Sequence, residues 1–455
     1  MVIMQDALPG LKRFLKPVGL NERMLALVIR CVVAFVMHLG RMAAARAATA
    51  IRSEPRHRAQ VCRFLGRRLL RRLSPAAVLR GQLLLMESRL SGRFFFLVDQ
   101  TLSSQQGSKT ENTFSTGNRQ RRPRKGRRYG KYKHARKTCH CFVKGLLITP
   151  SGIRIPFSRS YYTREYCEAK NRPYRTQTEL AAEMITDLPL PEEAKVVVLG
   201  DTAFDAKCIR QACAKRQYTW VVPLNPERVL AGPKGKRPKV RSLINGLTAD
   251  QLVKIRLHPG KGPLVEQRRV SPWRVGSKMK PRTYYVHHRR QAVHSVGEVQ
   301  LVFSTRTQPT KNQPVEVQKI LMTNDLSVSA KQMVEWYALR WQIELFFKEL
   351  KSTLGFHQYR FRKFERVEGW DELIQVTFLY LEWYRARQLQ RRDLPEEKKK
   401  WWRWQRTHGL CMAVRQAAEQ ADLEEIAQRL QTPTGLRRLQ RLLKRALPKE
   451  AAAAA

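Results

Sequence analysis

Two apolar runs that each end on an aspartate constrain the fold of this chain more than any other feature. The first is Phe94–Val98, followed by Asp99, and the second is Lys195–Gly200, followed by Asp201. Continuous apolar runs of this length predict strands that are buried on both faces. A helical pattern after the second run, at Phe204–Arg216, favours an α/β fold. Because α/β sheets build their sites at the ends of strands, the two carboxylates are candidate site residues.

The net charge of +50, from 87 Lys+Arg against 37 Asp+Glu, implies a polyanionic partner. A ribosome-like structural protein and a membrane-surface protein are alternatives. The apolar fraction of 43% and the 17 Phe and 9 Trp favour a folded core over a basic tail. The longest apolar run, Met24–Gly40, is interrupted by Arg30 and His38 and is shorter than the roughly 20 residues of a membrane span. We therefore expect a cytoplasmic nucleic-acid-binding protein without a membrane segment.

The densest basic stretch covers residues 118–137, in which eleven of the twenty residues are lysine or arginine. It is either a contact with the DNA backbone or a solvated loop that is disordered without DNA, and its charge density favours the contact. The candidate contact residues are Arg121, Arg122, Arg124, Lys125, Arg127 and Arg128.

The remaining patterns divide the chain into five segments. Strand patterns recur at 141–149, 153–162, 218–222 and 317–323, with a helical pattern at 176–188. A stretch rich in Gly, Pro, Lys and Arg carries strand patterns at 282–288 and 299–305 and predicts a β-rich insertion. The expected segments are an N-terminal helical DNA-binding region (1–90), the first part of an α/β core (91–225), the insertion (226–315), the second part of the core (316–365) and a C-terminal helical region (366–455).

A polar stripe lies on the helical pattern of the second core part. Tyr337, Arg340, Glu344 and Lys351 are separated by three, four and seven residues, which places them on one face of a single helix. Apolar residues on the neighbouring arc would anchor that helix in the core. A carboxylate among cations suits an Mg²⁺ ion and the phosphates of a nucleic acid.

Three distant carboxylates thus become candidates for one site: Asp99, Asp201 and Glu344. Strand-end aspartates are often capping or turn residues, so neither aspartate is decisive alone. Their combination with the Tyr–Arg–Glu–Lys pattern is a much stronger signal. Three convergent carboxylates can bridge two Mg²⁺ ions, for which Mn²⁺ could substitute.

The pattern resembles the YREK signature of DDE transposases from bacterial insertion sequences, the insertion-sequence-four group. The Asp99-Gln100-Thr101 start and the Gly200-Asp201-Thr202 turn are similar to that group, and the resemblance extends from about Arg93 to Leu354. It implies an RNase H-like catalytic core interrupted by the insertion, with Asp99, Asp201 and Glu344 as the catalytic, metal-binding triad. It implies that the remaining three motif residues, Tyr337, Arg340 and Lys351, contact phosphates.

The same resemblance implies cut-and-paste transposition in a bacterial, nucleoid-associated setting. The substrates would be the inverted repeats at the transposon ends and a target DNA, and the synaptic complex would hold a homodimer. Members of the group are thought to pass through a hairpin with a flipped base, whose unstacking an aromatic surface can offset. Trp273 is the candidate for that surface, and Tyr284 and Tyr285 are weaker ones; the alternative is that Trp273 packs the core of the insertion.

Two other functions remain open from the sequence. A catalytically silent, transposase-derived DNA-binding or regulatory protein would have no use for three intact carboxylates. A nuclease acting on RNA or on junctions would share the core, but the long stretch between Asp201 and Glu344 counts against it. The sequences of the inverted repeats, the target preference and the hairpin step are not readable from these residues.

Overall fold

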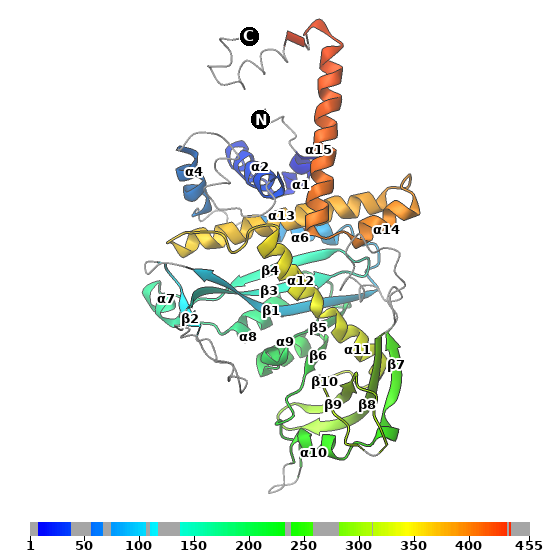
Figure 1. Ribbon diagram of the computed structural model, residues 1–455. Coiled ribbons are helices and arrows are strands. Elements are labelled where there is room, and N and C mark those ends of the chain that lie inside the picture. Colours follow the sequence, from blue (N-terminus) through cyan, green and yellow to red (C-terminus); the bar gives the residue numbers. More distant parts are fainter. Residues whose placement is uncertain are drawn as a thin grey trace, which may run out of the picture. The chain divides into compact units, whose positions relative to one another are not determined.

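The computed structural model describes residues 8–37, 56–66, 74–105, 110–116, 137–232, 238–257, 282–311, 313–434 and 436–437 (Figure 1). They form two compact units, each described by itself. The sheet unit is Leu83–Lys348, and the helical unit combines Met1–Gln82 with Glu349–Ala455. The five segments expected from the sequence stay a prediction.

A ten-stranded mixed sheet is the frame of the described part of the sheet unit. Its strands follow the order β2-β3-β1-β5-β6-β10-β9-β8-β7, and β4 also pairs with β3. Their bounds are β1 Arg93–Gln105, β2 Phe114–Thr116, β3 Lys137–Ile148, β4 Arg154–Ser160, β5 Lys195–Leu199, β6 Thr219–Pro223, β7 Val253–Leu257, β8 Arg282–Val293, β9 Gly297–Thr305 and β10 Lys319–Thr323.

Parallel pairing is confined to the centre of this sheet. Strand β5 runs parallel to both β1 and β6, whereas the other described pairs are antiparallel. The strands β7, β8 and β9 of the expected insertion continue this same sheet through β10, which pairs directly with β6. A separate insertion domain is therefore not confirmed. Mixed α/β architecture itself is confirmed and is consistent with an RNase H-like nuclease fold.

Helices cover both faces of the central strands. The α8 helix (Gln177–Thr186) contacts β1, β3, β4 and α9 (Lys207–Lys215), whereas α11 (Ala330–Leu339) contacts β5, β6 and β8. Side chains alternate along β1, and Phe95 meets Trp336 of α11 with ring centroids 6.3 Å apart. Val98, of the opposite parity, lies beside Phe204 and Ile209. Asp99 shares the parity of Phe95 and thus belongs to the α11 face of the sheet.

The remaining helices of the sheet unit are short, except for the helix that leaves it. They are α7 (Arg164–Ala169), the 3₁₀ turns η2 (Thr202–Phe204) and η3 (Ala249–Gln251), α10 (Val240–Asn245) and α12 (Trp341–Ser352), in which the boundary between the two units falls.

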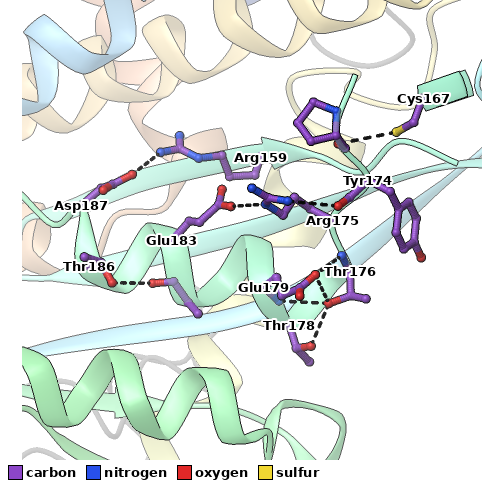
Figure 2. Close-up of polar contacts among 12 residues, drawn as sticks. Arg159, Cys167, Tyr174, Arg175, Thr176, Thr178, Glu179, Glu183, Thr186 and Asp187 are labelled. Carbon is purple, nitrogen blue, oxygen red and sulfur yellow. Dashed lines mark hydrogen bonds and ion pairs between the residues drawn. The ribbon is translucent and has the colours of Figure 1, made fainter. Parts of the chain in front are cut away.

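A polar network fixes the start and flank of α8 (Figure 2). Thr176 accepts a hydrogen bond from the backbone N–H of Glu179, and the Glu179 carboxylate accepts one in return from the backbone N–H of Thr176 at 2.8 Å. This capping box satisfies two backbone donors that the first turn leaves open. Arg175 pairs with Glu183 at 3.1 Å. These contacts are local to α8 and the residues that precede it, and they fix where the helix begins.

The helical unit is organised around one long helix, α13 (Phe364–Gln390). Helices that contact it are α1 (Leu11–Leu15), α2 (Glu22–Met37), α4 (Arg56–Leu65), α14 (Glu396–Trp404) and α15 (Thr407–Leu430). The 3₁₀ turn η1 (Lys16–Val18) and α6 (Pro75–Leu84) complete the described elements. Trp370 packs edge-on against Phe35 at 4.9 Å, and Gly369 lets the backbone of Leu65 approach closely. Aromatic packing along α13 therefore joins residues from both ends of the chain.

The described part of the apolar run that begins at Met24 lies in α2, and the buried residues of this helix are apolar. Searching the described helices finds none long and apolar enough to cross a membrane. All eight cysteines lie in described segments, none of them forms a disulfide, and most of them are buried.

Candidate active site

The register of the two parallel strands brings Asp99 and Asp201 to the same edge of the sheet. Leu97 of β1 pairs with Leu199 of β5, and each aspartate follows two residues after its member of that pair. The sequence predicted that β1 would end at Asp99, which is wrong, because β1 continues to Gln105 along its antiparallel partner β3. Asp99 therefore lies in the part of β1 that extends beyond the end of β5. On that side, β1 has no β5 residue beside Asp99.

The Asp201 carboxylate is fixed by the turn that follows β5. It accepts a hydrogen bond from the backbone N–H of Ala203 at 2.9 Å and so caps η2. Gly200 is required here, since a Cβ at this position would lie 2.9 Å from the Cβ of Phe204. The turn is therefore tightly packed behind the carboxylate.

Asp205 anchors the other end of that turn, a role that the sequence did not reveal. Its carboxylate forms ion pairs with Arg210 of α9 and with Arg228, the second at 2.9 Å, and only 10% of its side chain is exposed. Arg228 comes from the segment that leaves β6. A partner more than twenty residues away leaves no local sequence pattern, so only the fold could show this contact.

The single helix expected over Tyr337–Lys351 is wrong. The helix α11 ends at Leu339 and α12 begins at Trp341, with Arg340 at the junction. The backbone N–H of Arg340 bonds to the carbonyl of Tyr337 at 3.0 Å, and that of Ile343 bonds to the carbonyl of Arg340 at 3.1 Å. These three-residue bonds tighten the backbone and interrupt the α-helical pattern. Glu344 consequently lies in the first turn of α12, where the helix dipole favours a carboxylate.

Arg340 joins two of the three candidate carboxylates. Its Nη1 lies 3.3 Å from Oδ2 of Asp99, and its Nη2 lies 2.6 Å from Oε1 of Glu344. The exposed fractions of the Arg340, Asp99 and Glu344 side chains are 16%, 14% and 32%. Such a shielded, charge-assisted arrangement is stronger than a surface ion pair.

Mutual repulsion of the carboxylates is visible at Asp99. Burial raises the pKa of Asp99 to about 6, and the charges of Asp201 and Glu344 add to the rise. The backbone N–H of Gln100, 2.7 Å from Oδ1 of Asp99, and the Arg340 guanidinium oppose it. The fold thus gathers three acidic groups that the chain places more than one hundred residues apart.

Tyr337, in α11, lies near Arg340 and contacts Lys319 of strand β10. Burial raises the pKa of the Tyr337 phenol to about 12, so the hydroxyl keeps its proton at neutral pH. The ammonium group of Lys319 lies 4.8 Å from the centre of the Tyr337 ring, a cation–π contact. Lys319, from β10, is a second residue near the site that the sequence did not single out.

A cavity of about 280 Å³ adjoins these residues. Its lining combines aromatic side chains with cationic ones. They include Tyr284, Arg306, Lys319, Tyr337, Arg340 and Trp341. Aromatic faces and positive charge together suit a base and its phosphate.

The roles of the other predicted site residues stay predictions. Lys351 is in the last turn of α12 and belongs to the helical unit, where burial and the Lys351 charge both lower the pKa of His357. Trp273 lies outside the described residues. So do the six cations of the basic stretch, Arg121, Arg122, Arg124, Lys125, Arg127 and Arg128.

The donor chemistry of the site suits a hard divalent cation. Asp99, Asp201 and Glu344 offer carboxylate oxygens, which Mg²⁺ prefers. Within the described part of the chain, no group of three His, Cys, Asp or Glu residues forms a ready metal cage. The Arg340 guanidinium bonds to one oxygen of Asp99 and one oxygen of Glu344. The carboxylate oxygens are therefore suitable ligands for the ion, and the Arg340 guanidinium lies between two of these carboxylates.

Two protein-family models match the chain. A model described as a transposase DDE domain matches residues 167–380, which include Asp201 and Glu344. A model described as a DDE superfamily endonuclease matches residues 24–250, which include Asp99 and Asp201. Comparison with curated proteins finds no match. The two family matches support a DDE-superfamily transposase, and endonuclease domains of this kind typically use divalent metal ions.

Proposed function

We propose that this chain is a DDE transposase of the YREK, insertion-sequence-four group. It would cleave double-stranded DNA at the inverted repeats of its element and join the freed ends to target DNA. The observation that carries the proposal is the bridge from Arg340 to Asp99 and Glu344, two carboxylates from distant parts of the chain. The two family matches support the same chemistry.

Asp99, Asp201 and Glu344 would hold the divalent cations, Mg²⁺ or in its place Mn²⁺. When bound, such ions make a water or a 3′-hydroxyl a better nucleophile and stabilise the leaving oxygen. The chain itself contributes the fixed positions of these carboxylates. The Asp201 turn is held by the Ala203 N–H and by the packing of Gly200 on Phe204.

Tyr337, Arg340 and Lys351 would hold the phosphates around the cut. The Tyr337 hydroxyl is protonated at neutral pH and can donate a hydrogen bond to a phosphate oxygen. Arg340 can donate two parallel bonds to one phosphate. The assignment of Lys351 rests on the sequence motif alone.

The cavity beside Tyr337 would accept a nucleotide from the DNA end. Tyr284 and Trp341 supply aromatic surface there, and Arg306 and Lys319 supply positive charge. A base flipped out of the duplex, as a hairpin at the transposon end requires, could stack in it. Trp273 remains a second candidate for that stacking.

Replacing each triad residue by its amide tests the proposal. Asp99→Asn, Asp201→Asn and Glu344→Gln should each reduce Mg²⁺-dependent cleavage of the element's own ends by a factor of about 10³ or more, as loss of a metal ligand does at such sites. DNA binding, measured by fluorescence anisotropy, should persist. Glu335→Gln on α11 is a matched control and should cleave normally.

Near-normal cleavage by any of the three amide variants would remove that residue from the triad. A wild-type protein that binds the ends but never nicks them would favour the silent, regulatory alternative. The proposal also includes a homodimer on paired ends, which the mass of the complex with end DNA in light scattering would reveal. The DNA flanking the gene supplies the repeat sequences for all these assays.

A further inference from the structure

The guanidinium of Arg340 stands between two of the carboxylates that the proposed function assigns to metal binding. Its two terminal nitrogens bond to different carboxylates, at 3.3 Å to Asp99 and 2.6 Å to Glu344. One oxygen of Asp99 already accepts the backbone N–H of Gln100. Arg340 therefore uses the oxygen of Asp99 that the backbone leaves open.

The charges make Arg340 a competitor of a divalent cation. Asp99, Asp201 and Glu344 together carry three negative charges when ionised, and Arg340 neutralises one of them. A cation that entered with the guanidinium in place would meet a like charge at close range. It would also find two carboxylate oxygens occupied. Cation binding at full strength therefore requires that the guanidinium leave.

Arg340 also lines the cavity that Tyr337 and Trp341 line, so this residue borders both the carboxylates and the cavity. Arg306 and Lys319 make that cavity attractive to a phosphate. The Arg340 backbone has ordinary helical torsions, φ −50° and ψ −32°, at the junction of α11 and α12. Arginine side chains have several staggered rotamers, so the guanidinium can change position while the helix backbone stays as it is.

We propose that Arg340 couples cation binding to DNA binding. Without DNA, its guanidinium neutralises Asp99 and Glu344 and weakens cation binding. A DNA phosphate at the cavity draws the guanidinium away and frees both carboxylates for the cation. The inference rests on the proposed function, since it needs the triad to be a metal site. By linkage, the cation must strengthen DNA binding by the same factor, and such couplings are typically roughly 5- to 150-fold.

Isothermal titration of the full-length protein with Mn²⁺, in the absence of DNA, tests the coupling. Arg340→Gln should bind Mn²⁺ at least roughly fivefold more tightly than the wild type, at the lower end of such couplings. Arg340→Lys keeps the positive charge but loses the planar guanidinium whose two nitrogens bond to different carboxylates, so it should change affinity in the same direction by less. Arg306→Gln removes one positive charge from the same cavity and should change the affinity little, which controls for a general charge effect.

The reverse effect is measured with a labelled duplex of mixed sequence, which the enzyme need not cleave. Mn²⁺ should increase wild-type affinity for this duplex, in fluorescence anisotropy, more than it increases the affinity of Arg340→Gln. Wild-type or weaker Mn²⁺ affinity in both Arg340 variants would overturn the inference.

Asp201→Asn separates this inference from the function on which it rests. No bond to Arg340 is recorded for Asp201 among the described contacts, so this variant removes a ligand without releasing the guanidinium. Unchanged Mn²⁺ affinity in Asp201→Asn would overturn the metal site itself. Weakened affinity in Asp201→Asn, with no gain in the Arg340 variants, would overturn the coupling alone.

Discussion

At the scale of single residues, the ionised form of Asp99 is unfavourable in the folded protein because the side chain is buried beside other carboxylates. Its raised pKa means that the folded protein holds a proton there more tightly than the unfolded chain does. Between about pH 4 and about pH 6, this group therefore makes the free energy of unfolding fall as pH rises. Above about pH 6 the penalty is complete, and it is absent below the pKa of the unfolded chain.

Asp99→Asn should consequently stabilise the metal-free protein at neutral pH. A shift from 3.8 to about 6 corresponds to a gain of about 1 to 3 kcal/mol. Urea unfolding in the presence of a chelator should show this gain near pH 7.5 and almost none near pH 4. Asp187→Asn, at an exposed aspartate paired with Arg159, is a control that should show no comparable gain. A destabilised Asp99→Asn at neutral pH would contradict the prediction.

At the scale of secondary-structure elements, the approach of α4 to α13 depends on Gly369. A Cβ at this position would lie 2.2 Å from the carbonyl oxygen of Leu65, and backbone on both sides leaves nothing that can yield easily. Gly369→Ala should therefore destabilise the protein by about 1 to 3 kcal/mol, the cost of overpacking. The midpoint of thermal unfolding would fall.

Gly81→Ala is the matched control for this change. Gly81 lies within α6, and a Cβ there would meet nothing within 4 Å. Alanine should stabilise the helix by up to about 1 kcal/mol. If Gly369→Ala instead matched Gly81→Ala in sign, the close packing of α4 on α13 would be wrong.

Elements that are encoded locally could be predicted from the sequence. The strands β5, β8, β9 and β10 are confirmed with boundaries that differ by up to five residues, because an apolar run depends on neighbouring residues. The position of Asp201 after the end of β5 could be predicted for the same reason.

Long-range contacts explain what the sequence did not show. The Arg340 junction forms where the side chain meets Asp99, and β1 extends past Asp99 because β3 continues to pair with it. The anchor from Arg228 to Asp205 and the continuation of the sheet through β10 depend equally on partners far along the chain. The pattern of apolar residues within one segment does not indicate which distant residues that segment will contact.

At the scale of the whole molecule, a chain with a net charge of +50 contains an acidic site. Three ionised carboxylates within a strongly basic protein repel the phosphates that the rest of the surface attracts. Arg340, Lys319 and Arg306 lie around the carboxylates and the cavity, so cationic groups border the acidic centre. We infer that general affinity for DNA comes from the basic surface, whereas the carboxylates act only where a phosphate is held beside them.

This division predicts how salt and mutation affect DNA binding. Each phosphate contact contributes about 0.9 to the slope of log K against log salt concentration. Neutralising Arg121, Arg122, Arg124, Lys125, Arg127 and Arg128 together as glutamines should reduce the magnitude of that slope by up to about 5, and should weaken binding to all duplexes alike. The triad variants should leave the slope nearly unchanged. Anisotropy titrations over a range of potassium chloride concentrations measure both quantities. An unaltered slope in the six-residue variant would show that the basic stretch is a solvated loop, and the cations that bind DNA would then have to lie elsewhere.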